Sequence, residues 1–363
     1  MRILAISHYS HPVVYRPEAE IFIGLKKMGA DIRVINLPDS PWTERFRAEG
    51  IETMEKHPVK KFDREFIAFL RQYIISEKID VIHLFNSKAT INGLVAARGT
   101  KAKVALYRGY EGNIHWYDPS AYLKYLHPRV DKIFCIAGAV EDLIKRNLFR
   151  NKDKVITIRK GHNPEWYKDV VAKDVRAEFG FPADSTVFCC VANARPMKGI
   201  PYLVGAFEFI KNTNAYLVLI GEGLLDDEVQ AVIDKLPEAA QKRILFSGYR
   251  KDALQLVKGS DSFVLSSLYG EAITKSVIEA MNLGTAPIIT DIPGNVDLVV
   301  NKESGLVVEK ANSKALAEAI DFYTSDSEFR LKMGEGAKER MQNFFHIDRS
   351  IELYFKAYES MLK

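Results

Sequence analysis

The stretch SSLYGEAITKSVIEAMNLGTAPIITDIPG (266–294) decides the fold, because it leads from the end of one strand through a loop and a helix into another strand. The apolar run FVLSS (263–267) overlaps its start, an amphipathic helix is predicted over 274–282, and PIIT (287–290) is again short and apolar. Two buried strands joined through a helix are typical of a parallel sheet. The stretch therefore predicts an α/β protein.

The same alternation of strand and helix runs along the chain in two blocks. Expected strands lie at 3–7, 32–37, 81–85, 104–108, 133–137 and 155–159, and then at 187–193, 216–222, 244–249, 263–267, 287–290 and 305–309. A polar connection at 161–174 separates the blocks. With 363 residues, the pattern predicts two Rossmann-like, doubly wound domains. Ligands of such sheets bind beyond the carboxyl ends of the strands, so we expect a site in the cleft between the domains.

Two segments stand outside this alternation. The tail 346–363 reads as one amphipathic helix with no strand after it, so we expect it to return and pack on the N-terminal domain. The expected domains are therefore 1–165 plus 346–363 and 166–345. The irregular polar stretch 39–58 is interpreted as a mobile surface excursion.

Composition indicates an ordinary globular protein, with 47% hydrophobic and 27% charged residues. No apolar run approaches the roughly 20 residues that span a bilayer, and the N-terminus reads as a strand rather than a signal peptide. Cys135, Cys189 and Cys190 lie in apolar strand-like runs, so buried thiols in a reducing compartment are expected. The expected location is the cytoplasm.

The net charge of +4 hides an asymmetry between the two halves of the chain. Residues 1–165 carry 28 Lys and Arg against 19 Asp and Glu, a balance of 28 − 19 = +9, and residues 166–363 carry 23 against 28, a balance of −5. A basic half suggests an anionic partner, such as a phosphate-bearing acceptor, a membrane surface or nucleic acid. A solvated basic surface without a partner is an equal alternative. No nucleic-acid motif is present, and the acidic half argues against that partner.

The loop and helix start within 266–294 carry the residues with the clearest chemistry. The first N–H groups of the helix lack partners and its dipole is positive there, which suits a diphosphate, and Thr274, Lys275 and Ser276 add hydroxyls and a charge. Glu271 precedes the helix and Glu279 lies inside it. A carboxylate accepts two hydrogen bonds from adjacent sugar hydroxyls. The layout suits a nucleotide sugar, although two surface glutamates near a helix start are also common.

The segment EAITKSVIEAMNLGTAPIITDIPG (271–294) resembles the glutamate–seven–glutamate motif of retaining glycosyltransferases of family 4, which have the GT-B fold. The resemblance implies that Glu279 holds the donor ribose and that Glu271 contacts the transferred sugar. It also implies that the amides near Thr274 and Lys275 meet the diphosphate.

The resemblance extends over most of the chain. VANARPMKGIPYLVGAF (191–207) is similar to the strand, arginine and PxKG of the family, and it implies that Lys198 neutralises the leaving diphosphate. Asn193 stands at the place of the arginine, and Arg195 follows two residues later. LVLIGEG (217–223), with Gly221, and the run 244–267 also resemble the family, and there Tyr249 and Arg250 are implied to lie beside the base.

The first domain departs from the family pattern at two places. The usual Gly-Gly loop after the first strand is replaced by SHYSHPVVYRPEAE (7–20), where Arg16 is the most plausible phosphate contact. Arg108 stands where the family often has a histidine. An arginine stays protonated and cannot act as a base, so we expect it to stabilise negative charge. The candidates to line an acceptor site are Tyr9, His11, Arg16, His83, Arg108, Tyr110, His115 and Trp116, although His83 also suits the core.

No Asp-x-Asp pair occurs in the chain, so we expect no metal and no cofactor, with cationic side chains and helix amides stabilising the leaving group. The sequence therefore predicts a retaining hexosyltransferase that uses a UDP or GDP sugar. The acceptor is expected to be an anionic or lipid-linked glycan in polysaccharide or lipopolysaccharide assembly, with contact to a membrane through the basic domain. The alternatives are a nucleotide-sugar epimerase of the same fold and a non-catalytic nucleotide-sugar-binding protein.

Overall fold

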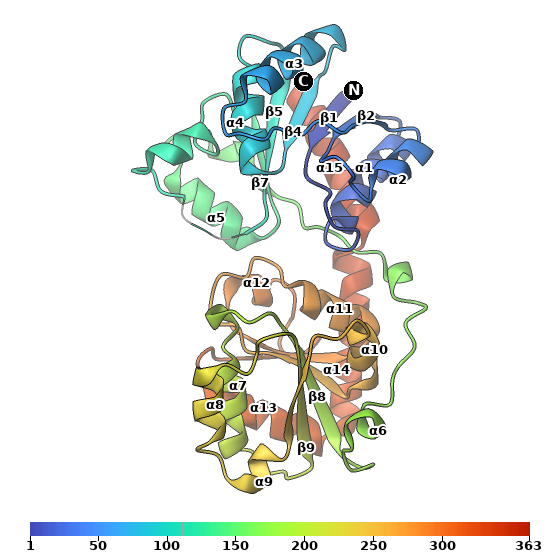
Figure 1. The fold of residues 1–363 in the computed structure, drawn as a ribbon, viewed down its shortest axis with the longest axis vertical. Coiled ribbons are helices and arrows are strands. Elements are labelled where there is room, and N and C mark those ends of the chain that lie inside the picture. Colours follow the sequence, from blue (N-terminus) through green and yellow to red (C-terminus); the bar gives the residue numbers. More distant parts are fainter. Residues whose placement is uncertain (111, 113) are drawn as a thin grey trace. The chain divides into compact units, whose positions relative to one another are not determined.

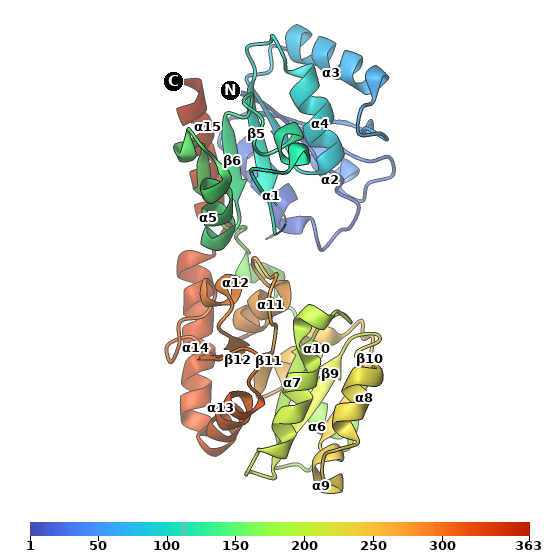
Figure 2. The same cartoon turned by 90° about the vertical axis from the view of Figure 1, so that its left-hand side faces the viewer.

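The computed structural model describes residues 1–110, 112 and 114–363. The chain divides into two compact units (Figures 1 and 2). The N-terminal unit comprises Met1–His162 and Phe345–Lys363, and the C-terminal unit comprises Asn163–Phe344. Each unit is one parallel β-sheet with helices packed on it, which confirms the predicted α/β, Rossmann-like fold class.

The N-terminal sheet has the strand order β3-β2-β1-β4-β5-β6-β7, and all its pairings are parallel. Its strands are β1 (Arg2–Ile6), β2 (Asp31–Ile35), β3 (Glu52–Met54), β4 (Val81–Leu84), β5 (Lys103–Arg108), β6 (Lys132–Cys135) and β7 (Val155–Thr157). The chain moves outward from β1 to β3 and then returns to β4 on the other side of β1. The order of the strands therefore reverses between β1 and β4.

The helices of the N-terminal unit are α1 (Arg16–Lys27), α2 (Thr43–Ala48), α3 (Arg64–Ser76), α4 (Ser87–Ala96), η1 (Pro119–Leu123), α5 (Gly138–Asn147), η2 (Lys152–Lys154) and α15 (Ile347–Leu362). The last of these, α15, packs along α1, so the predicted return of the C-terminal helix to the N-terminal domain is confirmed. The contact of Gly161 with the backbone of α15 is close, because a Cβ on Gly161 would lie 2.5 Å from the Cα of Ile347.

The C-terminal sheet has the order β10-β9-β8-β11-β12-β13 and is also parallel. Its strands are β8 (Thr186–Val191), β9 (Ala215–Ile220), β10 (Ile244–Gly248), β11 (Ser262–Leu265), β12 (Ala286–Thr290) and β13 (Leu306–Val308). Its helices are η3 (Pro164–Trp166), α6 (Val175–Phe179), η4 (Pro196–Lys198), α7 (Ile200–Gly205), η5 (Ala206–Glu208), α8 (Asp227–Ile233), α9 (Glu238–Gln241), α10 (Ala253–Gly259), α11 (Lys275–Leu283), α12 (Pro293–Val296), α13 (Ser313–Ser325) and α14 (Ser327–Phe344). Here the order reverses between β8 and β11.

An aromatic cluster joins α15 to the N-terminal sheet. The imidazole of His83, on β4, lies 5.0 Å from the ring of Phe134 and 5.9 Å from that of Tyr358, and its Nδ1 is 2.6 Å from the Tyr358 hydroxyl. Burial lowers the pKa of His83 to about 3. The side chain is therefore a neutral core group, which places His83 away from any acceptor at the surface.

The interpretation of residues 39–58 as an irregular surface excursion is wrong. The segment forms α2 and β3, and β3 pairs with β2 in register from Arg33 opposite Glu52. Trp42 and Phe46 are buried and anchor α2. The strand has only three residues and the helix six, too few to give a clear periodic signal against their polar neighbours.

The three cysteines are free and buried, as predicted. Burial raises the pKa of each thiol to about 12, so the thiols are protonated at neutral pH. Across the described residues, no helix combines the length and the apolar character needed to cross a bilayer.

Candidate active site

The site predicted from 266–294 lies in the C-terminal unit, where the strand order reverses between β8 and β11. Residues that follow two neighbouring parallel strands emerge at the same edge of a sheet. The loop after β8 carries Lys198, and the loop after β11 carries Glu271. The structure thus brings together two residues that are 73 positions apart in the chain.

The loop after β8 is held by a buried hydroxyl from the end of β11. Ser266 Oγ lies 2.9 Å from the carbonyl oxygen of Lys198 and 3.0 Å from that of Gly199. Gly199 has φ +62°, and a Cβ there would lie 2.3 Å from the carbonyl oxygen of Ser266. Glycine is therefore required at this position both for its left-handed backbone and for the close approach.

Lys198 and Glu271 form an ion pair in which both side chains are largely buried, with 11% and 13% of their surfaces exposed. Ser267 Oγ lies 3.4 Å from the same oxygen of Glu271. A buried charge pair is costly to break on one side only, so the two residues position each other. The roles of both residues toward a ligand stay predictions.

The helix start predicted near Thr274 is also present. Thr274 is the N-cap residue of α11, and its Oγ1 contacts Asn295 Oδ1 at 3.1 Å rather than a backbone N–H group of the helix. Glu279, one turn inside the helix, forms an ion pair with Lys275. The first N–H groups of α11 receive no side-chain cap, which leaves them available to an anion. Ser276 is partly buried in the first turn.

A layer of buried polar side chains lies under this edge of the sheet, and sequence reasoning missed it. Thr290 Oγ1 donates to the carbonyl oxygen of Ser267, and Asn295 Nδ2 lies 3.4 Å from the carbonyl oxygen of Thr290. Ser266, Ser267, Thr290 and Asn295 have no exposed surface. Thr290 falls within the family pattern and Asn295 lies outside it, and nothing in a single sequence shows that small polar residues are buried.

The other donor-side candidates of the C-terminal unit follow the strands β8, β9 and β10. Gly221 has φ +155°, and a Cβ there would lie 2.0 Å from the carbonyl oxygen of Ala192, so the ends of β9 and β8 meet closely. Asn193 and Arg195 are exposed on the loop after β8. Tyr249 is exposed, and Arg250 bonds Asp252 and, at 2.6 Å, Glu178. The guanidinium of Arg250 is therefore occupied by carboxylates.

The candidates of the N-terminal unit divide into core and surface groups. Arg108 is buried, with its Nε 2.9 Å from the carbonyl oxygen of Tyr110 and its guanidinium 3.7 Å from the centre of the Tyr110 ring. Tyr9 is fully buried with φ +47° and packs on Phe46. Like His83, Tyr9 has no exposed surface that could contact an acceptor.

The remaining candidates lie at the surface or at a helix start. Nδ1 of His11 accepts hydrogen bonds from the N–H groups of Val13 and Val14, at 3.2 and 3.3 Å. Arg16 is the first residue of α1. His115 stacks on Tyr117, and Trp116 is exposed. Sequence reasoning did not single out His8, His57 and Lys88, which lie together at the carboxyl edge of the sheet.

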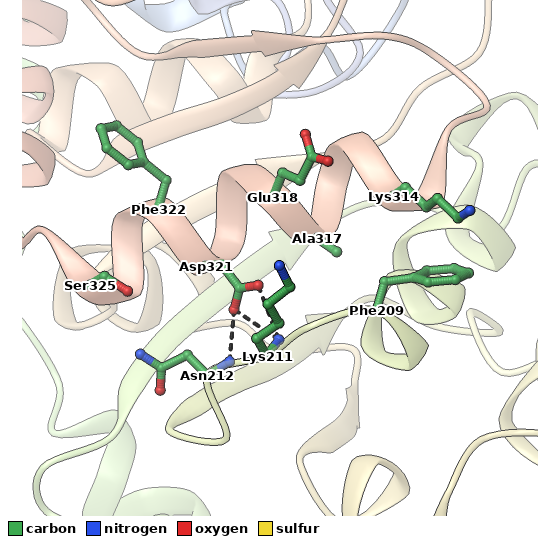
Figure 3. Close-up of a pocket in the computed structure, with 9 residues that line it drawn as sticks. All are labelled: Phe209, Lys211, Asn212, Lys314, Ala317, Glu318, Asp321, Phe322 and Ser325. Carbon is green, nitrogen blue, oxygen red and sulfur yellow. Dashed lines mark hydrogen bonds between the residues drawn. The ribbon is translucent and has the colours of Figure 1, made fainter.

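A groove of about 570 Å³ in the C-terminal unit lies elsewhere (Figure 3). It is lined by Phe209, Lys211, Asn212, Lys314, Ala317, Glu318, Asp321, Phe322 and Ser325. Asp321 accepts from the N–H groups of Lys211 and Asn212, which precede the amino end of β9. Because Lys198 and Glu271 follow carboxyl ends of strands, the groove is not part of their site.

Two Rossmann-like units in one chain, with a carboxylate–lysine pair beside a helix start in one of them, define a protein of the GT-B class. Residues 171–340 match the family model described as glycosyl transferases group 1, and residues 19–166 match that described as glycosyltransferase family 4. The chain is therefore a glycosyltransferase of the group 1 and family 4 type.

Two curated relatives are similar over nearly their whole length. The chain is 25% identical to the UDP-Gal:alpha-D-GlcNAc-diphosphoundecaprenol alpha-1,3-galactosyltransferase of Escherichia coli, over 92% of this chain and 89% of that one. It is 24% identical to the N,N'-diacetylbacillosaminyl-diphospho-undecaprenol alpha-1,3-N-acetylgalactosaminyltransferase of Campylobacter jejuni, over 100% of both.

Solved structures share the fold. A glycosyltransferase from Rickettsia africae superposes with a TM-score of 0.82 at 19% identity, covering 100% of this chain and 98% of that one. HepE from Anabaena in complex with UDP superposes with a TM-score of 0.77 at 17% identity, covering 99% of this chain and 100% of that one.

The close approach at Gly199 leads to a testable prediction. Gly199→Ala forces a Cβ into a backbone carbonyl, whereas Gly180→Ala places one at a similar φ of +70° with nothing within 4 Å. We expect Gly180→Ala to lower the free energy of unfolding by about 1 kcal/mol, and Gly199→Ala to lower it by a further ~1–3 kcal/mol. Urea unfolding of both variants measures the difference. Equal losses of stability in the two variants would show that the loop after β8 shifts to accommodate the added Cβ at no cost.

Proposed function

We propose that the chain is a retaining glycosyltransferase that moves a hexosyl group from a UDP or GDP sugar to an anionic, lipid-linked glycan. The observation that carries the proposal is the Lys198–Glu271 pair at the β8–β11 switch, beside the uncapped start of α11. Glu279 holds the ribose, Glu271 contacts the hexose, and Lys198 with Arg195 neutralises the diphosphate. Thr274, Lys275 and Ser276 contribute amides and hydroxyls at the helix start.

The names of the relatives support the proposed classes of donor and acceptor substrate. The Escherichia coli relative is named for UDP-Gal and a diphosphoundecaprenol acceptor, and HepE was solved with UDP. A lipid-linked diphosphate also suits the excess of basic residues in the N-terminal half, 28 against 19 acidic. The product would then belong to a cell-surface polysaccharide or lipopolysaccharide.

The leaving diphosphate is stabilised without a metal ion in this proposal. The ammonium of Lys198 and the N–H groups of α11 supply the positive charge that a metal would otherwise provide. The diphosphate then accepts the acceptor's proton on the face of the sugar from which it departs, which retains the anomeric configuration. Arg108 stabilises negative charge in the N-terminal unit rather than acting as a base.

The test is a transfer assay with UDP- and GDP-hexoses, a polyprenyl-diphosphate-linked sugar and a chelator. We expect a glycoside with the donor's anomeric configuration, read by NMR. An absolute requirement for magnesium or manganese would exclude the metal-free mechanism. Formation of an isomeric nucleotide sugar without acceptor would identify an epimerase, and binding without turnover would identify a non-catalytic protein.

Two glutamate variants separate the proposed donor contacts. Glu279→Gln should weaken the binding of UDP and UDP-sugar alike, by about tenfold, because the ribose loses an ionised acceptor. Glu271→Gln should weaken mainly UDP-sugar and leave UDP binding equal or tighter, because it frees Lys198 for the diphosphate. Calorimetric titration of both ligands measures the split. The assignment is wrong if both variants respond alike to both ligands.

The aromatic surface of the N-terminal unit supports contact with a membrane. Trp116, Tyr117 and Phe149 are 55%, 65% and 75% exposed, and the rings of Trp116 and Phe149 lie 6.1 Å apart. Exposed basic residues adjoin this aromatic surface, namely Arg146, Arg150 and Lys152. Aromatic rings beside basic side chains bind the interface of anionic bilayers. The enzyme accordingly acts in the cytoplasm at the inner face of the membrane.

Vesicle co-sedimentation tests this surface. A Trp116→Ser/Phe149→Ser variant should bind vesicles with anionic headgroups several-fold more weakly than the parent, because it loses two exposed aromatic rings that would enter the membrane interface. Phe322→Ser, which removes an exposed aromatic ring of the C-terminal unit, is the control and should bind normally. Equal binding by all three proteins would assign the aromatic surface to another partner.

A further inference from the structure

The strand order of the N-terminal sheet reverses between β1 and β4 (Figure 1). This reversal carries its own cluster of hydrogen-bonding groups, with the ammonium of Lys88 beside them. His8 follows β1, Asn86 follows β4 and caps α4, and His57 comes from the segment after β3. Such a reversal is where open parallel sheets bind ligands. The corresponding reversal in the C-terminal unit holds Lys198 and Glu271, so the two sheets offer comparable positions with different chemistry.

The geometry fixes one imidazole and leaves the other available. Asn86 Nδ2 lies 2.9 Å from His57 Nε2, and because an amide nitrogen only donates, that Nε2 accepts. His57 Nδ1 then carries the proton and donates to the carbonyl oxygen of Pro58 at 3.1 Å. The rings of His57 and His8 lie 4.5 Å apart. His57 is buried and fully bonded, so it serves as a support against which the half-buried ring of His8 lies.

The charges around the two rings favour an anion. Burial and then Lys88 lower the pKa of His8, and burial, His8 and Lys88 together lower the pKa of His57 to about 4. Within the described residues, no carboxylate is among the groups that act on either ring. Lys88 is exposed on the first turn of α4. Because these lowered pKa values keep both imidazoles neutral at neutral pH, the rings serve as hydrogen-bonding groups, and the ammonium of Lys88 beside them is the charge that a phosphate complements.

We propose that His8 and Lys88 bind a phosphate group of the acceptor at the β1–β4 switch, with His57 as a positioning residue that acts through Asn86 and the ring of His8. The inference rests on the proposed function for the identity of the ligand as the acceptor, since a lipid-linked sugar presents a diphosphate. The binding groups are the ammonium of Lys88 and the imidazole of His8. The imidazole takes up a proton as the phosphate approaches and donates a ring N–H to it.

The experiment follows the imidazole resonances of the full chain, which has only eight histidines, by NMR during titration with inorganic pyrophosphate. We expect saturable shifts of the His8 and His57 signals. Lys88→Met should weaken pyrophosphate binding by about tenfold, because it removes a charge-assisted contact. Lys101→Met, the same change at an exposed loop of the same unit, is the matched control and should bind as the parent does.

Two further variants separate binding from positioning. His8→Asn should abolish the response of the His57 signal to pyrophosphate. His57→Asn should reduce the shift of the His8 signal while thermal stability and UDP binding stay unchanged, which a merely structural role of His57 would not give.

Four results would overturn the proposal. If millimolar pyrophosphate shifts no histidine signal, or if Lys88→Met and Lys101→Met weaken pyrophosphate binding equally, His8 and Lys88 form no phosphate site. Binding of pyrophosphate but not of farnesyl diphosphate, a short polyprenyl diphosphate, would exclude the lipid-linked source. Displacement of pyrophosphate by UDP would assign the site to the donor. If pyrophosphate and farnesyl diphosphate bind but the transfer assay gives no glycoside, the site stands and the proposed function alone fails.

Discussion

The hydrogen bonds from Ser266 to the carbonyls of Lys198 and Gly199 are the constraint on which the candidate site depends. They fasten the loop after β8 to the end of β11, and they do so without any exposed surface on Ser266. Buried polar groups are stable only when their partners are complete, so a fully bonded layer also fixes one arrangement. Thr290 and Asn295 continue the layer toward Thr274 at the start of α11. The side chains above it are thereby held at one edge of the sheet.

The two units have the same reversal of strand order but gather different side chains at it. Each sheet reverses its strand order once, and each reversal gathers functional side chains from loops that are distant in sequence. In the C-terminal unit the gathered groups include carboxylates, Glu271 and Glu279, each paired with a lysine. In the N-terminal unit they are His8 and Lys88, and within the described residues no carboxylate is among the groups that shift the pKa of His8 or His57. The basic balance of the N-terminal half and the acidic balance of the C-terminal half thus correspond to the side chains gathered at the two strand reversals.

The sequence predicted the parallel sheets, the returning helix and the start of α11 near Thr274, because long periodic segments and a dense motif carry strong signals. It did not predict β3, which has three residues, or the burial of Tyr9. Tyr9 follows β1 in a loop and looks available, yet its ring packs on Phe46 of α2, an element that had not been recognised. The contact of His8 with His57 was equally hidden, since it requires the position of β3 beside β2. When a short helix or strand is not predicted from the sequence, the positions of the site residues that pack against it are therefore predicted wrongly as well.

The ion pairs of the donor-side carboxylates bear on how a ligand would enter. Lys198 bonds Glu271, and Lys275 bonds Glu279, so both carboxylates are already paired with a lysine. Removing one member of such a pair leaves a desolvated charge, which costs several kcal/mol. Under the proposed function, a nucleotide sugar exchanges these partners instead of removing them, because its diphosphate takes Lys198 while its hydroxyls take Glu271. The ligand-free pairs then keep both side chains in place at little net cost, and they favour a ligand that brings diphosphate and sugar together.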